Sequence, residues 1–221
     1  MSTKPAPQKK KSGSGNATFW IGAAIAVVVG AAAVVAITMS GSSDDSSAGD
    51  IKNFGTVTVA GEPLPVNTGA ANDPAIGMSA PVLTGEGFTG NVVTTAPGAP
   101  TLLIYLAHWC PNCQAEVPKL VEWYESGGVP DSLDVIAIAT QVDPTLPNFP
   151  PSQWLTREGF PKLWPVMLDD AKGTAANAMG ADGWPYFVLL DADGKVMVRR
   201  SGQVEIEELN SIIGTALGLS T

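Results

Sequence analysis

Cysteine and histidine are scarce in this chain of 221 residues, which contains two cysteines and one histidine. Cys110 and Cys113 are separated by two residues, and no other cysteine is present to form structural disulfides or to complete a four-cysteine zinc site. In an oxidising compartment such an isolated pair cannot exchange with other thiols of its own chain. This arrangement suits a reactive pair better than a disulfide-stapled scaffold.

Basic residues are also few, with 12 Lys and Arg against 21 Asp and Glu, and the net charge is -9. Several of the lysines lie in the first eleven residues, so the rest of the chain is more acidic still. Because a surface of that sign repels phosphate backbones, we expect no nucleic-acid partner. The neighbouring Arg199 and Arg200 are expected at a solvated strand end.

Long hydrophobic runs are absent except for residues 19–39, which contain no charged side chain. At about 1.5 Å per residue this run spans about 31 Å, the thickness of a bilayer core. Lysines lie only before the run, and Asp44, Asp45 and Asp50 follow it. The positive-inside rule therefore predicts a basic cytoplasmic tail over residues 1–18 and a single transmembrane helix over residues 19–39. The remainder is predicted to lie outside the plasma membrane, so the lipid bilayer is an expected partner.

A cleaved secretory signal peptide is the alternative interpretation of this run. Such peptides have hydrophobic regions of about 7 to 15 residues and a small-residue cleavage site, and residues 19–39 fit neither feature. The Ser-, Gly- and Asp-rich residues 40–52 predict a flexible linker. Residues 53–221 then form one domain of ordinary length.

The pattern after residue 100 predicts an α/β domain of alternating strands and helices. Residues 101–107 (TLLIYLA) form a continuous apolar run of strand length, and residues 113–126 carry apolar side chains at helical spacing. A weak alternation at residues 54–65 favours an edge hairpin. Further strands are expected at residues 133–140, 165–169, 186–191 and 195–202, and further helices at residues 153–158 and 205–217.

A Cys-Pro-Asn-Cys motif lies where the first predicted strand leads into a helix. Free backbone N–H groups and the dipole at a helix N-terminus favour the thiolate form of Cys110. Pro111 suits the first helical position, which needs no N–H donor. Cys110 is therefore expected to attack a disulfide, and the more buried Cys113 to resolve the mixed disulfide. This chemistry requires no metal and no organic cofactor.

Residues 101–118 (TLLIYLAHWCPNCQAEVP) resemble the active-site strand and helix of the thioredoxin superfamily, and in particular its TlpA/ResA/DsbE-like extracytoplasmic branch. Trp109 matches the tryptophan before the first cysteine, Pro118 the helix-kinking proline, and Glu116 the glutamate that this branch carries near its active site. The similarity extends over residues 76–218. It implies a thioredoxin-like fold, in which a central mixed sheet is flanked by helices.

The resemblance implies a thiol-disulfide oxidoreductase that acts on protein thiols and disulfides outside the membrane. A membrane or thioredoxin-like redox partner is expected to recycle it. Residues 183–202 resemble the cis-proline loop and terminal hairpin of the family, which implies a cis bond before Pro185 facing the cysteines. Trp109, Trp184 and Pro185 are accordingly expected to bind substrate.

Two positions depart from the family pattern. Ile104 stands where thioredoxins carry a buried aspartate, so Glu116 is the candidate catalytic proton acceptor for Cys113. Trp184 stands where the family more often has a small or β-branched residue, so the substrate groove is expected to have a different shape.

Several alternatives stay open at this point. His108 either assists the thiolate or covers the rim of the site. Together with Cys110 and Cys113 it defines a rival function, copper binding and delivery. A thiol peroxidase and a redox-inert binding module are the other candidates. Three aromatic residues after the central strand predict either core packing or a lid: Trp154, Phe160 and Trp164.

Overall fold

The computed structural model describes residues 51–219, so the predicted tail at residues 1–18, the predicted transmembrane helix at residues 19–39 and most of the predicted linker lie outside the described residues. None of the helices between residues 51 and 219 has both the length and the apolar character needed to cross a membrane. This part of the chain folds into two sheets and four helices.

The larger sheet has five strands in the order β6-β5-β4-β7-β8. They are β4 (Thr101–Leu106), β5 (Asp134–Ala139), β6 (Val166–Leu168), β7 (Tyr186–Leu190) and β8 (Val196–Ser201). β4, β5 and β6 run parallel, whereas β7 pairs antiparallel with both β4 and β8. The sheet is therefore mixed, as the thioredoxin-like resemblance predicts.

β4 lies at the centre of this sheet and is buried along its whole length. Because successive side chains of a strand point to opposite faces, Leu102, Ile104 and Leu106 pack on one face and Leu103 and Tyr105 on the other. A strand covered on both faces requires apolar side chains throughout. The continuous run TLLIYLA meets that requirement.

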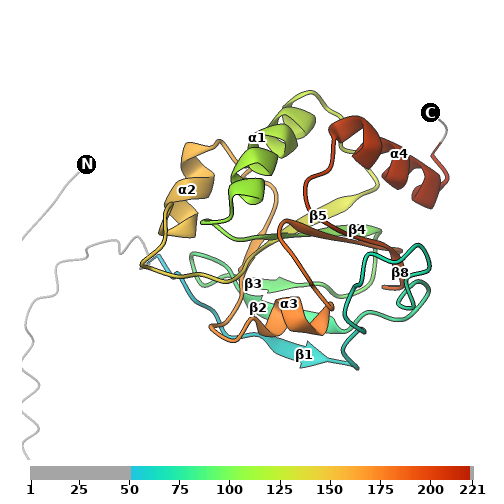
Figure 1. Cartoon of the computed structure of the whole chain (residues 1–221), viewed down its shortest axis with the longest axis horizontal. Coiled ribbons are helices and arrows are strands. Elements are labelled where there is room, and N and C mark those ends of the chain that lie inside the picture. The colour runs from blue at the N-terminus through green and yellow to red at the C-terminus, as the bar shows by residue number, and fades with distance from the viewer. Residues whose placement is uncertain (1–50, 220–221) are drawn as a thin grey trace, which may run out of the picture. The chain divides into compact units, whose positions relative to one another are not determined.

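Helices cover one face of the sheet. α1 (Pro111–Glu125), α2 (Pro151–Arg157) and α4 (Ile206–Leu217) contribute buried side chains to the same cluster as Leu102 and Ile104. Figure 1 shows these three helices together on one side of β4 and β5. Tertiary packing of their apolar faces therefore encloses the end of β4, where the cysteine motif begins.

A small antiparallel sheet covers the other face, with strands β1 (Thr58–Ala60), β2 (Val82–Glu86) and β3 (Val92–Thr94) in that order. Its residues pack with the short helix α3 (Thr174–Ala178) against Leu103 and Tyr105. The hairpin expected within residues 54–65 is wrong. β1 is only three residues long and pairs instead with β2, a strand distant in the sequence, with Val59 opposite Leu83.

Arg199 contradicts the expectation of a solvated strand end. Its guanidinium is buried and donates hydrogen bonds to Asp73 at 2.7 Å, to the carbonyl of Pro65 at 2.7 Å and to that of Met179 at 3.1 Å. The Arg199 guanidinium lowers the pKa of Asp73. Arg200, by contrast, is exposed and pairs with Glu208 at 2.8 Å. Arg199 thus fastens the segment before β2 to β8.

We expect Arg199→Met to lower the free energy of unfolding by about 3 to 5 kcal/mol, because the substitution leaves Asp73 and two carbonyl groups without their donor. The matched variant Arg200→Met removes an exposed pair and should cost less than about 1 kcal/mol. Urea unfolding at pH 7 measures both values. Equal losses in the two variants would contradict a special role for the buried pair.

Candidate active site

The two cysteines lie at the start of α1, at the carboxyl end of β4. Cys110 precedes the helix with extended backbone angles, and Pro111 is the first helical residue. The backbone carbonyl of Ala107 accepts a hydrogen bond from the Cys110 N–H at 3.0 Å, and the Ala107 N–H donates to the Cys113 sulfur at 3.4 Å. One tight turn therefore fixes the backbone of Cys110 and the sulfur atom of Cys113.

The two thiols differ in exposure. Cys110 is 8% exposed and Cys113 is fully buried, and both are free thiols in this structure. Burial raises the pKa of Cys113 well above its ordinary value. Cys113 is therefore held as a thiol at neutral pH, and it needs a proton acceptor before it can act as a nucleophile.

Glu116 lies three residues after Cys113 on α1, a spacing that puts both side chains on one face of the helix. It is fully buried, and its two carboxylate oxygens accept the Val204 N–H at 3.2 and 3.3 Å. Burial raises the pKa of Glu116 to about 7. At neutral pH this carboxyl group is therefore poised between its protonated and ionised forms.

Ile104 is fully buried in the same cluster as Cys113 and supplies only apolar packing there. Between residues 51 and 219, the buried carboxylates are those of Glu116 and Asp169. Asp169 accepts hydrogen bonds from the backbone of α3 at Ala175 and Ala176, on the opposite face of the sheet. Glu116 is therefore the buried carboxylate on the cysteine side of the described fold.

The peptide bond between Trp184 and Pro185 is cis, as the resemblance implies. The Trp184 carbonyl lies 3.6 Å from the Cys110 sulfur, whose thiol donates to it. The Pro185 carbonyl accepts the Gly202 N–H at 2.8 Å. The structure thus brings the cis-proline loop directly against the Cys110 thiol, the less buried of the two, with the Trp184 side chain half-buried between the two core clusters.

Trp109 and His108 both bind residues 141–150, the connection between β5 and α2. The Trp109 indole N–H donates to the Gln141 carbonyl at 2.7 Å. His108 is buried, its Nε2 accepts the Asp143 N–H at 3.2 Å, and its Nδ1 lies 2.7 Å from the Pro147 carbonyl. These partners require a neutral ring with its proton on Nδ1. Both ring nitrogens are engaged, so a copper site that includes His108 would require this connection to open.

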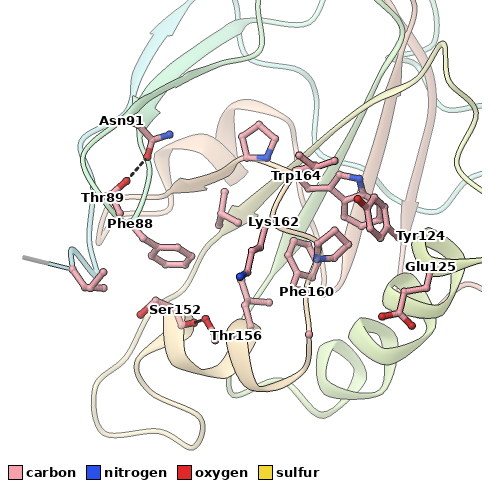
Figure 2. Close-up of a pocket in the computed structure, with 17 residues that line it drawn as sticks. Phe88, Thr89, Asn91, Tyr124, Glu125, Ser152, Thr156, Phe160, Lys162 and Trp164 are labelled. Atoms are coloured by element: carbon pink, nitrogen blue, oxygen red, sulfur yellow. Dashed lines mark hydrogen bonds between the residues drawn. The ribbon is translucent and has the colours of Figure 1, made fainter. Parts of the chain in front are cut away.

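The aromatic residues after β5 belong to the core. Trp154, Phe160 and Trp164 are buried in the cluster that contains α1, and the Phe160 and Trp164 ring centroids are 5.4 Å apart. Phe160 and Trp164 also line a cleft of about 690 Å³ between α2 and Phe88, shown in Figure 2. Neither cysteine lines this cleft, which is therefore separate from the thiol pair.

Sequence reasoning did not find the connection at residues 141–150 as part of this site. Its bonds to His108 join residues 35 and 39 positions apart, a distance over which no sequence period operates. The available signal was a Pro-rich segment directly after a strand that neighbours β4. Because β5 runs parallel to β4, this segment begins at the same edge of the sheet as the end of β4.

Comparisons with known proteins agree with this geometry. Residues 71–215 match the Redoxin family. The thiol:disulfide interchange protein DsbE of Vibrio cholerae is 33% identical over 109 residues, which cover 48% of this chain and 52% of that protein. The chain thus spans about half the length of this curated relative.

Solved structures share the fold. A thioredoxin-family thiol:disulfide interchange protein from Chlorobium tepidum is 25% identical, with a TM-score of 0.51 over 63% of this chain and 96% of that one. StoA from Bacillus subtilis, at 20% identity, has a TM-score of 0.50 over 63% of this chain and 99% of its own, and supports the fold alone. The match over residues 71–215 covers more than half of the sequence and confirms the resemblance, and the chain therefore belongs to the redoxin family, with a thioredoxin-like fold.

Proposed function

We propose that this protein is a thiol-disulfide oxidoreductase that exchanges disulfides with protein substrates through Cys110 and Cys113. The observation that carries the proposal is the pairing of a partly exposed thiol against the Trp184 carbonyl with a second, fully buried thiol one turn behind it. Family membership and the thiol:disulfide interchange relatives support the same chemistry.

The exchange proceeds in two steps. The Cys110 thiolate attacks a substrate disulfide, forms a mixed disulfide and releases one substrate thiolate, which takes up a proton. Cys113 then gives its proton to Glu116 and attacks the Cys110 sulfur, which forms the Cys110–Cys113 disulfide and releases the second substrate sulfur as a thiolate, which also takes up a proton. The substrate gains two electrons and the enzyme loses two. In the reverse direction, the disulfide form oxidises a substrate dithiol.

The substrate is expected to bind beside the cis-proline loop. The half-buried Trp184 offers its carbonyl and side chain on one side of Cys110, next to the buried Pro185, and Trp109 precedes the thiol directly. Because proline has no N–H group, it leaves this edge open to an extended polypeptide. We propose that protein thiols and disulfides bind here, and that a membrane or thioredoxin-like partner restores the starting redox state.

We further propose that residues 19–39 anchor the enzyme in the plasma membrane, with residues 1–18 in the cytoplasm and the redox domain outside. The support is the uncharged run and the lysines that precede it. A cleaved signal peptide would give the same compartment without the anchor.

The roles of the two cysteines predict different trapping behaviour. Cys113→Ser should still attack substrates but should not resolve the mixed disulfide, so covalent complexes should accumulate and be released by reductant. Cys110→Ser should abolish both turnover and trapping, because the remaining thiol is buried. Non-reducing electrophoresis with reduction of the isolated complexes measures both outcomes. Equal trapping by the two variants would contradict the assignment of Cys110 as the attacking thiol and Cys113 as the resolving thiol.

The role of Glu116 predicts a change in pH dependence. Glu116→Gln should slow resolution by about tenfold or more and remove an inflection near pH 7, because no carboxylate then accepts the Cys113 proton. Stopped-flow kinetics from pH 5 to 9 measures this effect. An unchanged profile would assign Glu116 a structural role alone.

The same substitution should change stability in a defined direction. The pKa of Glu116 is raised from 4.5 to about 7, so its contribution to folding is complete below pH 4.5 and is lost as pH rises through 7. The free energy of unfolding of the wild-type protein should thus fall by about 3 kcal/mol between pH 4.5 and 8. The Glu116→Gln variant, which has no carboxyl group at this position, should not show this decrease.

The membrane anchor predicts protection of the N-terminus. A protease added outside intact cells should remove the redox domain and leave residues 1–18 intact. Antibodies against tags at both ends of the chain measure this on a membrane fraction. Recovery of the mature protein in the soluble extracytoplasmic fraction, starting after residue 39, would replace the anchor by a cleaved signal peptide.

A further inference from the structure

The connection at residues 141–150 is fastened to the cysteine loop from several directions. The His108 ring bonds the backbone at Asp143 and Pro147, and the His108 carbonyl accepts the Asn148 side-chain amide at 3.2 Å. The Trp109 indole bonds the Gln141 carbonyl at 2.7 Å. The two residues directly before Cys110 therefore hold both ends of this connection.

The connection has a defined shape of its own. Gln141 and Asn148 have φ angles of 50° and 63°, a region in which side chains other than glycine are rare. The Asp143 carboxylate accepts both the backbone N–H and the hydroxyl of Thr145, at 2.8 and 2.7 Å. Arg157 of α2 donates to the Asn148 side chain at 2.8 Å. Leu146 lies within this connection and has 37% of its surface exposed.

Sheet order puts this connection and the cis-proline loop on opposite sides of Cys110. β5 and β7 flank β4 on its two sides. β5 runs parallel to β4, so residues 141–150 leave it at the edge where β4 ends. β7 runs antiparallel, so Pro185 enters it at that same edge. Cys110, which follows β4, therefore lies between residues 141–150 and the cis-proline loop, which form two walls beside the thiol.

We infer that residues 141–150 form the second wall of the substrate groove, an inference that rests on the proposed function. Leu146 of this wall binds an apolar side chain next to the substrate cysteine. His108 is the positioning residue that holds the wall in place. The partner is thus an extended polypeptide with a large apolar residue beside its cysteine. Trp109 and Trp184, both half-buried, pack against the apolar cluster that contains the two cysteines.

Charge supports this choice of ligand. His108 is neutral when its Nε2 accepts a backbone N–H, and the Asp143 carboxylate is occupied by Thr145. The His108 ring nitrogens and the Asp143 carboxylate therefore have hydrogen-bond partners within the protein. Contact between the exposed Leu146 and an apolar substrate side chain would stabilise the complex, because it removes apolar surface from water.

The test uses the full-length chain in detergent with two disulfide-linked peptides that differ only in the residue next to cysteine, Leu or Asp. Wild-type protein should prefer the Leu peptide by about tenfold in kcat/KM, the discrimination of a single apolar contact. Leu146→Ser should abolish this preference. The matched control Leu163→Ser, at an exposed leucine that lines the separate cleft, should keep it.

His108 variants test the positioning role. His108→Ala should lose the preference mainly through a higher KM for the Leu peptide, because the wall is no longer held. His108→Asn carries an amide donor and a carbonyl acceptor, and it should restore most of the preference. A loss that is the same in both variants and falls on kcat would contradict positioning.

Separate outcomes distinguish this inference from the proposed function. If wild-type protein exchanges with neither hydroxyethyl disulfide nor the peptides, the proposed function fails. If it exchanges with hydroxyethyl disulfide and treats the two peptides alike, or if Leu146→Ser keeps the wild-type preference, the second wall is wrong while the oxidoreductase proposal stands.

Discussion

The turn between β4 and α1 is the constraint on which the site depends. Ala107 bonds backbone to backbone with Cys110 and backbone to sulfur with Cys113, so the end of a buried strand fixes the backbone of Cys110 and the sulfur atom of Cys113. β4 is itself held at the centre of the sheet by a parallel and an antiparallel neighbour. Those neighbours deliver residues 141–150 and the cis-proline loop to the same edge. Fold and site are thus consequences of one strand's position.

Burial gives the two cysteines of the motif different environments. Cys110 keeps a small exposed surface beside the Trp184 carbonyl, whereas Cys113 lies wholly inside the apolar cluster. A buried thiol cannot readily lose its proton to water, and a second buried acid, Glu116, lies on the same helical face, where the mechanism that we propose uses it as the proton acceptor. The folded state tolerates that carboxyl group with a raised pKa and a single backbone donor.

Much of the central sheet follows from the sequence, because a strand buried on both faces needs a continuous apolar run. The predicted strands at residues 101–107 and 133–140 correspond to β4 and β5, and the helix predicted at 113–126 is α1. α3 was not predicted, since five residues carry too little periodicity. It forms where the Asp169 carboxylate accepts the N–H groups of Ala175 and Ala176. The bonds of His108 likewise depend on residues that only the fold brings near.

The spacing of two sulfur atoms within one helical turn has a kinetic consequence. In the exchange that we propose, the attack of Cys113 is intramolecular because Cys113 lies in the same turn as Cys110, and well-oriented intramolecular groups act at effective concentrations of about 10⁵ M or more. The lifetime of a mixed disulfide is then independent of how dilute the enzyme is. This lifetime sets how long a second cysteine of the bound polypeptide has to react with the mixed disulfide before Cys113 releases the polypeptide.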